Sequence, residues 1–382
     1  MKENNMFETE EDFISNASDI ENNDESEEII SPFDPKLISL ETKPLSLEQI
    51  IGRIKRGTLD LQPPFQRAFI WDETKQSRLI ESLMLRIPLP MFYFSADIAG
   101  SYQVVDGLQR LNTLYNFIEK KKSFKLKNLE FWKEHENKTF TELEPYLQNR
   151  ILETTMQVTI INPSTPENVK RNVFKRINTG GYPLSSQEIR HALYEGKSTE
   201  LLKSLVDNKD FKTVMGNKFK DLRMAGREII LRFLSFYINK PAEYKIVDMD
   251  EWLSKTMQII NKYNDHQIKE LENIFIKAVR RAYIIFSDYA FRKSLPNNKK
   301  TPINKTLFEV WCFALVSLSD EEFGILTKNK NTLIEKLKIL YETNRFQISV
   351  SRDSWKVESV KYRYENVASV INLITGGKLC LF

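Results

Sequence analysis

The chain has 382 residues, of which 41% are hydrophobic and 11% aromatic, a composition typical of one large or two ordinary globular domains. No stretch approaches about 18 uninterrupted apolar residues, and no charged-then-apolar leader resembles a signal peptide, so neither membrane insertion nor secretion is indicated. With only two cysteines, Cys312 and Cys380, a disulfide framework is not expected. The predicted location is a reducing cytoplasm.

The net charge of +4 hides an uneven distribution. Residues 1–30 contain eleven acidic residues and one basic residue, Lys2, so their net charge is −10 and residues 31–382 carry +14. Such an acidic segment without periodic apolar positions is expected to be disordered, and we assign a disordered leader to residues 1–35. It is either a solvated tail or an acidic segment that competes with DNA for the basic body.

Helix and strand signals alternate after the leader. Residues 45–56 have the apolar spacing of a helix with Ser46 as its N-cap, and Asp72 caps a second helix that ends before Pro88. Short aromatic and β-branched runs at residues 91–95 and 102–105 predict two strands. The second of these strands leads directly into a glycine turn.

Helical spacing resumes after that turn at Leu111, and residues 157–161 predict a further strand. Thr165 begins a helix through Ile177, and Ser185 and Glu188 have the spacing of a capping box. Apolar stripes then predict helices at residues 228–237, 252–263, 268–286, 307–318 and 333–341. The predicted class is α+β, with an α/β domain at residues 36–195 followed by a mostly helical domain at residues 196–382.

The predicted strand–turn–helix carries Asp106-Gly107-Leu108-Gln109-Arg110. A strand that feeds a helix through a glycine gathers backbone N–H groups and the positive end of a helix dipole, which suits phosphate oxygens. Arg110 would add a planar fork of donors, and Asp106 would hold Mg²⁺ or orient a hydrolytic water. In the alternative interpretation, Asp106 caps the helix and Arg110 forms a surface ion pair.

Three further segments accompany this loop: Gln66-Arg67 with Trp71, Phe174-Lys175-Arg176-Ile177-Asn178-Thr179-Gly180-Gly181, and Glu188-Ile189-Arg190. Together with the loop they resemble, over roughly residues 40–240, the N-terminal domain family of GmrSD-type restriction enzymes. The resemblance implies a fold similar to that of ParB and sulfiredoxin. It also implies a nucleoside triphosphate of unknown base as ligand and Mg²⁺ as cofactor.

The family's Asp-Gly-Gln-Gln-Arg loop is associated with nucleotide binding and hydrolysis. Asp106, Gly107, Gln109 and Arg110 match it, whereas Leu108 replaces the first glutamine and removes a polar contact. The resemblance therefore implies catalytic roles for Asp106 and Arg110, a metal ligand in Asp106, and nucleotide contacts from Gly107 and Gln109.

The other matched segments supply further nucleotide-binding candidates. Gln66 and Arg67 resemble the family's second basic element, and Arg176 with Asn178 resembles its third. Alternatively, Arg67 forms a salt bridge, and Asn178 supplies turn geometry between two helices. Glu188 and Arg190 are expected to be structural, through the capping box and an ion pair.

Basic and aromatic residues interleave near the C-terminus. Arg345, Lys361 and Arg363 would contact DNA phosphates while neighbouring tyrosines stack on bases. A solvated basic edge of an amphipathic helix or strand is the alternative. The three histidines, His135, His191 and His266, occur in unrelated contexts, so an HNH-type nuclease within this chain is not expected and a separate HNH-type subunit would be its partner.

Three functions are consistent with these features. The first is a nucleoside-triphosphate-hydrolysing sensor or switch of a modification-dependent, type IV-like DNA restriction or anti-phage defence system, acting with DNA and open to homo-oligomerisation. The second is a metal-dependent DNA endonuclease that uses Asp106. The third is a non-enzymatic, ParB-like DNA-binding adaptor.

Overall fold

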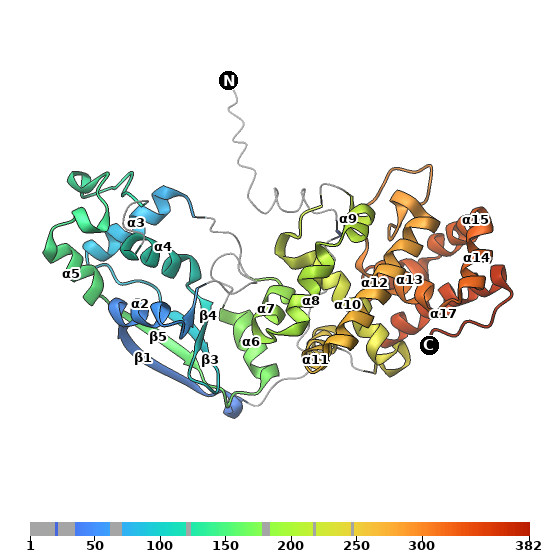
Figure 1. Cartoon of the computed structure of the whole chain (residues 1–382), viewed down its shortest axis with the longest axis horizontal. Coiled ribbons are helices and arrows are strands. Elements are labelled where there is room, and N and C mark those ends of the chain that lie inside the picture. The colour runs from blue at the N-terminus through green and yellow to red at the C-terminus, as the bar shows by residue number, and fades with distance from the viewer. Residues whose placement is uncertain are drawn as a thin grey trace, which may run out of the picture. The chain divides into compact units, whose positions relative to one another are not determined.

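The computed structural model describes residues 20–21, 35–61, 71–119, 124–177, 184–216, 219–245 and 248–382. The chain forms two compact units, which are described here separately (Figure 1). The α/β unit comprises Pro32–Leu193. The helical unit comprises Tyr194–Phe382 together with Met1–Ser31, of which Ile20 and Glu21 are described.

A mixed five-stranded sheet in the order β1-β5-β3-β4-β2 organises the α/β unit. Its strands are β1 (Leu40–Ser46), β2 (Leu59–Asp60), β3 (Phe92–Ala96), β4 (Tyr102–Asp106) and β5 (Thr155–Ile161). β1 runs antiparallel to β5 and β3 antiparallel to β4, whereas β3 is parallel to β5 and β2 is parallel to β4. The strand that ends at Asp106 therefore lies between β3 and the short β2.

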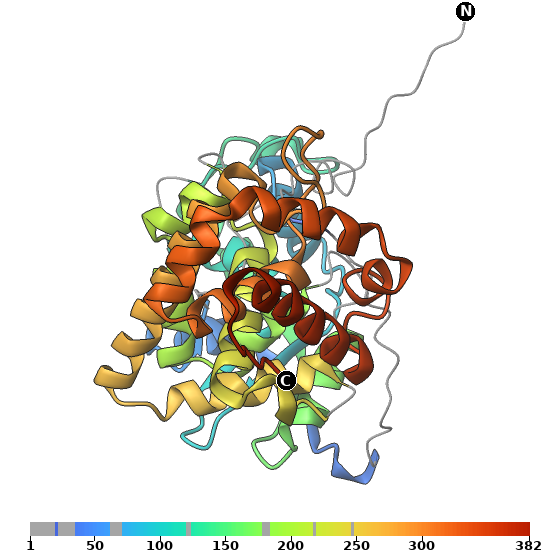
Figure 2. The ribbon, with the colours of Figure 1, turned by 90° about the vertical axis from the view of Figure 1, so that its right-hand side faces the viewer.

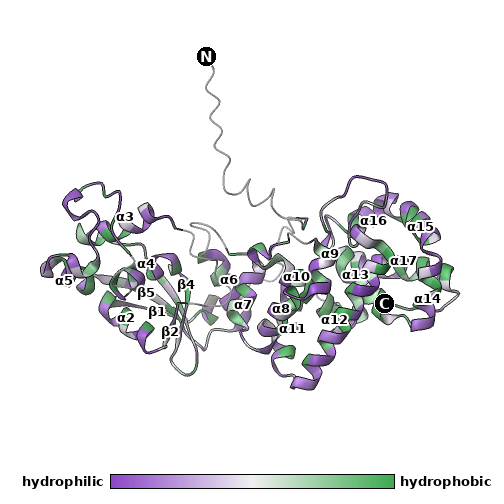
Figure 3. Ribbon diagram, turned by 45° about the horizontal axis from the view of Figure 1, so that its top comes forward, coloured by the Kyte–Doolittle hydropathy of each residue, from purple (hydrophilic) through white to green (hydrophobic). Residues whose placement is uncertain are grey.

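Helices pack on this sheet and close one hydrophobic core. They are α2 (Leu47–Lys55), α3 (Glu73–Met84), α4 (Leu108–Glu119) and α5 (Pro145–Glu153). α6 (Glu167–Ile177) contacts β4 and packs against α7 (Ser186–Leu193). Hydrophobic and hydrophilic colours alternate along the helices in Figure 3, as expected for helices that bury one face.

The predicted helix starts are confirmed by their hydrogen bonds. Ser46 forms a capping box with Gln49, and the Asp72 carboxylate accepts the N–H of Lys75 at 2.7 Å. The Glu188 carboxylate accepts the N–H of Ser185 at 2.6 Å, and the Ser185 hydroxyl accepts the N–H of Glu188 at 3.1 Å. These caps fix where three helices of the unit begin.

Strand β1 was not predicted from the sequence. It lies at the edge of the sheet, and its side chains are exposed or half-buried, so no buried face produces an alternating pattern. It also contains Pro44, which an edge strand tolerates because one of its sides needs no N–H donors. The pattern that identifies buried strands is therefore missing here.

Glu81 on α3 is a buried carboxylate with an unusual pKa. Its oxygens accept the N–H groups of Glu130, Phe131 and Trp132 at 2.8–2.9 Å. Burial alone would raise the pKa of Glu81, but these backbone donors and the Arg78 charge lower it, and the result lies below the ordinary value. The carboxylate thus stays charged to a lower pH than in the unfolded chain.

We expect Glu81 to contribute to acid sensitivity. Because its folded pKa lies below the unfolded value of about 4.3, its stabilisation is fully present above that pH and is lost as the pH falls through the folded pKa. Glu81→Gln should lower the urea midpoint at pH 7 and reduce the further loss between pH 5 and about 3. Equal acid sensitivity of the two proteins would contradict this assignment.

The helical unit is built around α13. Its helices are α8 (Lys197–Val206), α9 (Lys209–Met215), α10 (Ala225–Asn239), α11 (Met249–Asn261), α12 (Asp265–Phe286), α13 (Lys305–Ser317), α14 (Asp320–Lys328), α15 (Lys330–Glu342), α16 (Asn344–Ser349) and α17 (Val357–Thr375). Every residue from Thr306 to Leu315 is buried, and α13 packs against α10, α12 and α17. Figure 2 shows these helices in a second view, with α17 in dark red.

The α+β class is thus confirmed, with a sheet-containing N-terminal region and a helical C-terminal region. Cys312 is a buried free thiol, and burial raises its pKa well above the ordinary value. Within the described ranges, no helix combines the length and apolarity that a membrane crossing requires.

Candidate functional site

The turn between β4 and α4 consists of a single residue, Gly107. Its φ of +97° is one that L side chains rarely adopt, and a Cβ on it would lie 2.4 Å from Cδ1 of Phe92. The Gly107 carbonyl accepts the N–H of Leu111 at 2.9 Å, the first backbone hydrogen bond of α4. Glycine is therefore required both for the sharp turn and for the close approach to Phe92.

Asp106 and Arg110 face each other across this turn. Arg110 Nη2 donates to Asp106 Oδ2 at 2.9 Å, and their side chains are 11% (Arg110) and 40% (Asp106) exposed. Among the described residues, Asp106 Oδ1 accepts no hydrogen bond. One carboxylate oxygen is therefore anchored while the other is available at a partly exposed position.

Arg110 also secures the start of β3. Nη1 donates to the Pro90 carbonyl, Nη2 donates to the Met91 carbonyl at 3.1 Å, and the guanidinium lies 4.3 Å from the centre of the Phe92 ring. Burial lowers the pKa of Arg110 and the Asp106 charge partly offsets this, but an arginine stays protonated in a protein. The guanidinium thus ties α4 to the neighbouring strand.

These contacts correct the expected role of Arg110. The sequence predicted a fork of donors directed at phosphate, but both terminal nitrogens are engaged by Asp106 and two backbone carbonyls. The ion pair is the one foreseen in the alternative interpretation, although the arginine is nearly buried rather than at the surface. Arg110 is positioned to orient Asp106.

The N-terminal end of α4 places partial positive charge beside the Asp106 carboxylate. The N–H groups that precede Leu111 have no carbonyl acceptor within the helix, and the helix dipole places partial positive charge there. An anion bound at the N-terminal end of α4 would lie near the negatively charged Asp106 and be repelled by it. A cation between the anion and Asp106 would offset that repulsion. The junction therefore suits a phosphate group that is bound together with a metal ion.

Magnesium fits this donor set. Within the described ranges, no three His, Cys, Asp or Glu side chains gather into a metal cluster. Mg²⁺ is commonly held by one or two carboxylates together with substrate phosphates and water, rather than by a cage of protein ligands. Asp106, with one oxygen available, matches that mode of binding.

The other predicted nucleotide ligands are only partly located. Gln109 is half-buried on α4, and Arg176 is exposed in the last turn of α6, a helix that contacts β4. Gln66, Arg67 and Asn178 lie outside the described residues. The structure therefore brings together Asp106, Gly107, Gln109 and Arg110.

Arg190, expected to be structural, is 2% exposed and donates from Nε to Gln187 at 2.9 Å. The carbonyls of Pro90 and Met91 were missed by sequence reasoning. No residue pattern identifies backbone acceptors that lie 20 and 19 positions from their donor. The two prolines, Pro88 and Pro90, are the one local sign of a fixed backbone before β3.

The C-terminal DNA-binding candidates divide into exposed and buried residues. Arg345 and Lys361 are exposed, and Arg345 lies 4.3 Å from the centre of the Tyr362 ring. The prediction for Arg363 was wrong. Its side chain is 0% exposed, pairs with Glu309 on α13 and donates from Nη1 to the Ser354 carbonyl at 2.6 Å, so it cannot reach DNA in this structure.

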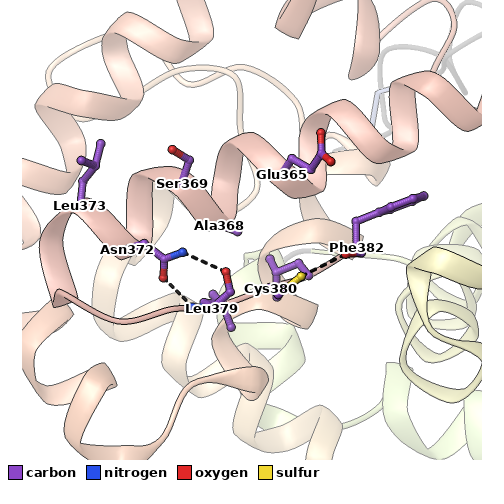
Figure 4. Close-up of a pocket in the computed structure, with 9 residues that line it drawn as sticks. Glu365, Ala368, Ser369, Asn372, Leu373, Leu379, Cys380 and Phe382 are labelled. Carbon is purple, nitrogen blue, oxygen red and sulfur yellow. Dashed lines mark hydrogen bonds between the residues drawn. The ribbon is translucent and has the colours of Figure 1, made fainter.

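A cavity of about 440 Å³ lies between α17 and the following residues, which return along the helix (Figure 4). Asn372 holds this segment by donating to the Leu379 carbonyl at 2.9 Å and accepting the Leu379 N–H at 2.7 Å. The cavity is lined by Glu365, Ala368, Ser369, Asn372, Leu373, Leu379, Cys380, Leu381 and Phe382. With no lysine or arginine among these residues, the cavity does not suit a phosphate.

Comparison with known families identifies the α/β unit. Residues 47–195 match the family described as GmrSD restriction endonuclease, N-terminal domain. This part of the chain is therefore similar to that N-terminal domain. The match begins with α2, ends just after α7 and includes the Asp106–Arg110 turn. Neither the comparison with curated proteins nor that with solved structures found a match.

Proposed function

We propose that the GmrSD N-terminal domain of this chain binds a nucleoside triphosphate with Mg²⁺ at the β4–α4 junction and hydrolyses it slowly. The observation that carries this proposal is the half-exposed Asp106 carboxylate next to the start of α4, separated from it by a glycine that tolerates no side chain. The family match supports a role in a DNA restriction system.

Each residue of the junction has a distinct proposed role. Asp106 holds the metal through Oδ1 while Arg110 keeps Oδ2 in place, which makes Arg110 a positioning residue. The N–H groups at the start of α4 face phosphate oxygens, and Leu108 adds no polar contact. Gln109 and Arg176 contribute further donors. Bound magnesium supplies neutralising charge to the phosphates.

Such a domain would act as a switch in a modification-dependent system. Nucleotide can control DNA binding or a separate nuclease subunit only if the two nucleotide states interact with that partner with different free energies. We also propose that the chain as a whole binds DNA and that its N-terminal domain has a ParB-like fold. A cytoplasmic location is part of it as well.

Phosphate release from GTP, ATP, CTP and UTP with Mg²⁺ tests the proposal. Asp106→Asn should lower the rate by about 100-fold, because a neutral amide holds a metal poorly. Asp97→Asn is a matched control from the same hairpin, where the Asp97 side chain accepts the Ser101 N–H at 2.8 Å, and it should retain the rate. Equal rates for both variants would remove Asp106 from the site.

The non-enzymatic adaptor predicts a different outcome. A chain that grips the DNA backbone rather than nucleotide would release no phosphate from any triphosphate, yet it would bind DNA with a steep salt dependence. The endonuclease alternative is less favoured, because the described residues contain no cluster of carboxylates around Asp106.

A further inference from the structure

Two residues of the acidic leader are attached to the helical unit. Ile20 forms a parallel bridge with Ile303, just before α13, and the N–H of Glu21 donates to the Ile303 carbonyl at 2.8 Å. Ile20 is 3% exposed and Ile303 is 0% exposed. The expectation of a disordered leader was therefore wrong for these two residues.

The Glu21 carboxylate is recognised by two side chains at once. Lys293 Nζ lies 2.5 Å from Oε1, and Asn304 Nδ2 donates to Oε2 at 2.8 Å. Lys293 also donates to the Ser351 hydroxyl at 2.8 Å. The Lys293 and Glu21 side chains are 31% and 28% exposed, so the ion pair is partly shielded from solvent. An apolar or basic residue in place of Glu21 would lose both contacts.

The groups that hold the leader are fixed by the helical unit itself. Asn304 is 0% exposed, caps α13 by accepting the Leu307 N–H at 2.8 Å, and donates to the Val350 carbonyl at 2.8 Å. Ile303 also bridges Arg292 in the antiparallel sense, and the Asn304 N–H donates to the Phe291 carbonyl at 2.8 Å. These bonds lie within the helical unit and do not involve the leader, so Ile303 and Asn304 are held by contacts other than those with Ile20 and Glu21.

We propose that Lys293, Ile303 and Asn304 form a docking socket for an extended peptide in which an aliphatic residue precedes a carboxylate. The chain's own Ile20–Glu21 is its occupant, bound reversibly. The peptide backbone pairs with Ile303 as an added strand, and the buried Ile20 side chain provides the apolar contact. Lys293 and Asn304 both bind the Glu21 carboxylate, which makes the site selective for an acidic residue at that position. The socket does not depend on the proposed nucleotide site.

So short a ligand is expected to bind weakly when it is not tethered. In the intact chain the leader is covalently attached, which makes its binding intramolecular and favours it over a free peptide of the same sequence. The leader should therefore occupy its own socket most of the time. A free peptide of the same sequence should compete poorly with it.

A peptide-binding experiment on the full-length chain tests this proposal. The double substitution Ile20→Asp and Glu21→Lys should release the leader from the socket without shortening the chain. A fluorescent peptide of residues 14–27, followed by anisotropy, should bind this variant at least about 10-fold more tightly than the unaltered chain, in which the leader competes. No binding to the emptied variant up to about 1 mM, or equal binding to both proteins, would overturn the proposal.

Charge reversal checks the chemistry of the socket. In a chain emptied by Ile20→Asp with Glu21→Ala, whose own leader has no lysine at position 21, Lys293→Glu should abolish binding of the peptide, and a peptide with Glu21→Lys should recover part of it. Lys300→Glu is a matched control on the same loop, because Lys300 pairs with Asp288 at 2.8 Å and has no hydrogen bond or ion pair with Ile20 or Glu21, the described residues of the leader. Loss of binding in the Lys300 variant alone, or an unaffected Lys293 variant, would contradict the assignment.

Discussion

Replacing Glu309 by alanine is expected to destabilise the helical unit by about 3–5 kcal/mol, because it leaves two buried arginines without their counter-charge. Glu309 on α13 accepts from Arg232 Nε on α10 at 2.9 Å and from Arg363 Nε on α17 at 3.1 Å. All three side chains are at most 1% exposed. This cluster joins the three helices at the centre of the unit.

A matched control exists on the surface of α17. Glu365 lies 3.8 Å from Lys361, and both side chains are more than half exposed, so Glu365→Ala should cost only about 0–1 kcal/mol. Urea unfolding followed by circular dichroism would measure both variants, with separate transitions fitted if the two units unfold independently. Similar midpoints for the two variants would show that the buried cluster is not a major source of stability.

Replacing Gly107 by alanine should damage the nucleotide site and the fold together. Its Cβ would meet two atoms of the Phe92 ring at 2.4 and 2.8 Å and Arg110 Nη2 at 3.1 Å, on a backbone with φ of +97°. Overpacking and backbone strain together should cost about 3 kcal/mol. Displacement of Arg110 would also release Asp106, so nucleotide affinity should fall by at least about 10-fold.

Gly100 separates these two causes. It also has positive φ, +83°, but nothing lies within 4 Å of a Cβ placed there, so Gly100→Ala should cost only the backbone strain of about 1 kcal/mol. Thermal unfolding and nucleotide titration of both variants would measure the difference. If Gly107→Ala were no more harmful than Gly100→Ala in either measurement, the tight packing at the junction would have no functional meaning.

Local rules predicted the elements that carry the site. Capping residues located the starts of α2, α3 and α7, and short aromatic runs located β3 and β4. These signals depend on neighbours within a few positions, which is why a single sequence suffices for them. Edge strand β1 has no buried face, so the sequence pattern did not predict it.

Contacts between distant positions were not predictable in the same way. The inward orientation of Arg110 depends on the carbonyls of Pro90 and Met91, which precede Arg110 in the chain by the whole β3–β4 hairpin. Arg363 was misassigned although a signal was available. Val360, Arg363, Tyr364 and Val367 follow the spacing of one helix face, and all four are buried. Reading that stripe would have placed Arg363 in the core.

The central claim is that the β4–α4 junction binds a nucleoside triphosphate with magnesium. Isothermal titration of the full-length chain with GTP, ATP, CTP and UTP in the presence of Mg²⁺ tests it most directly. We expect saturable heat with at least one of the four nucleotides, lost in Asp106→Asn and retained in Asp97→Asn. Flat titrations with all four nucleotides would contradict it.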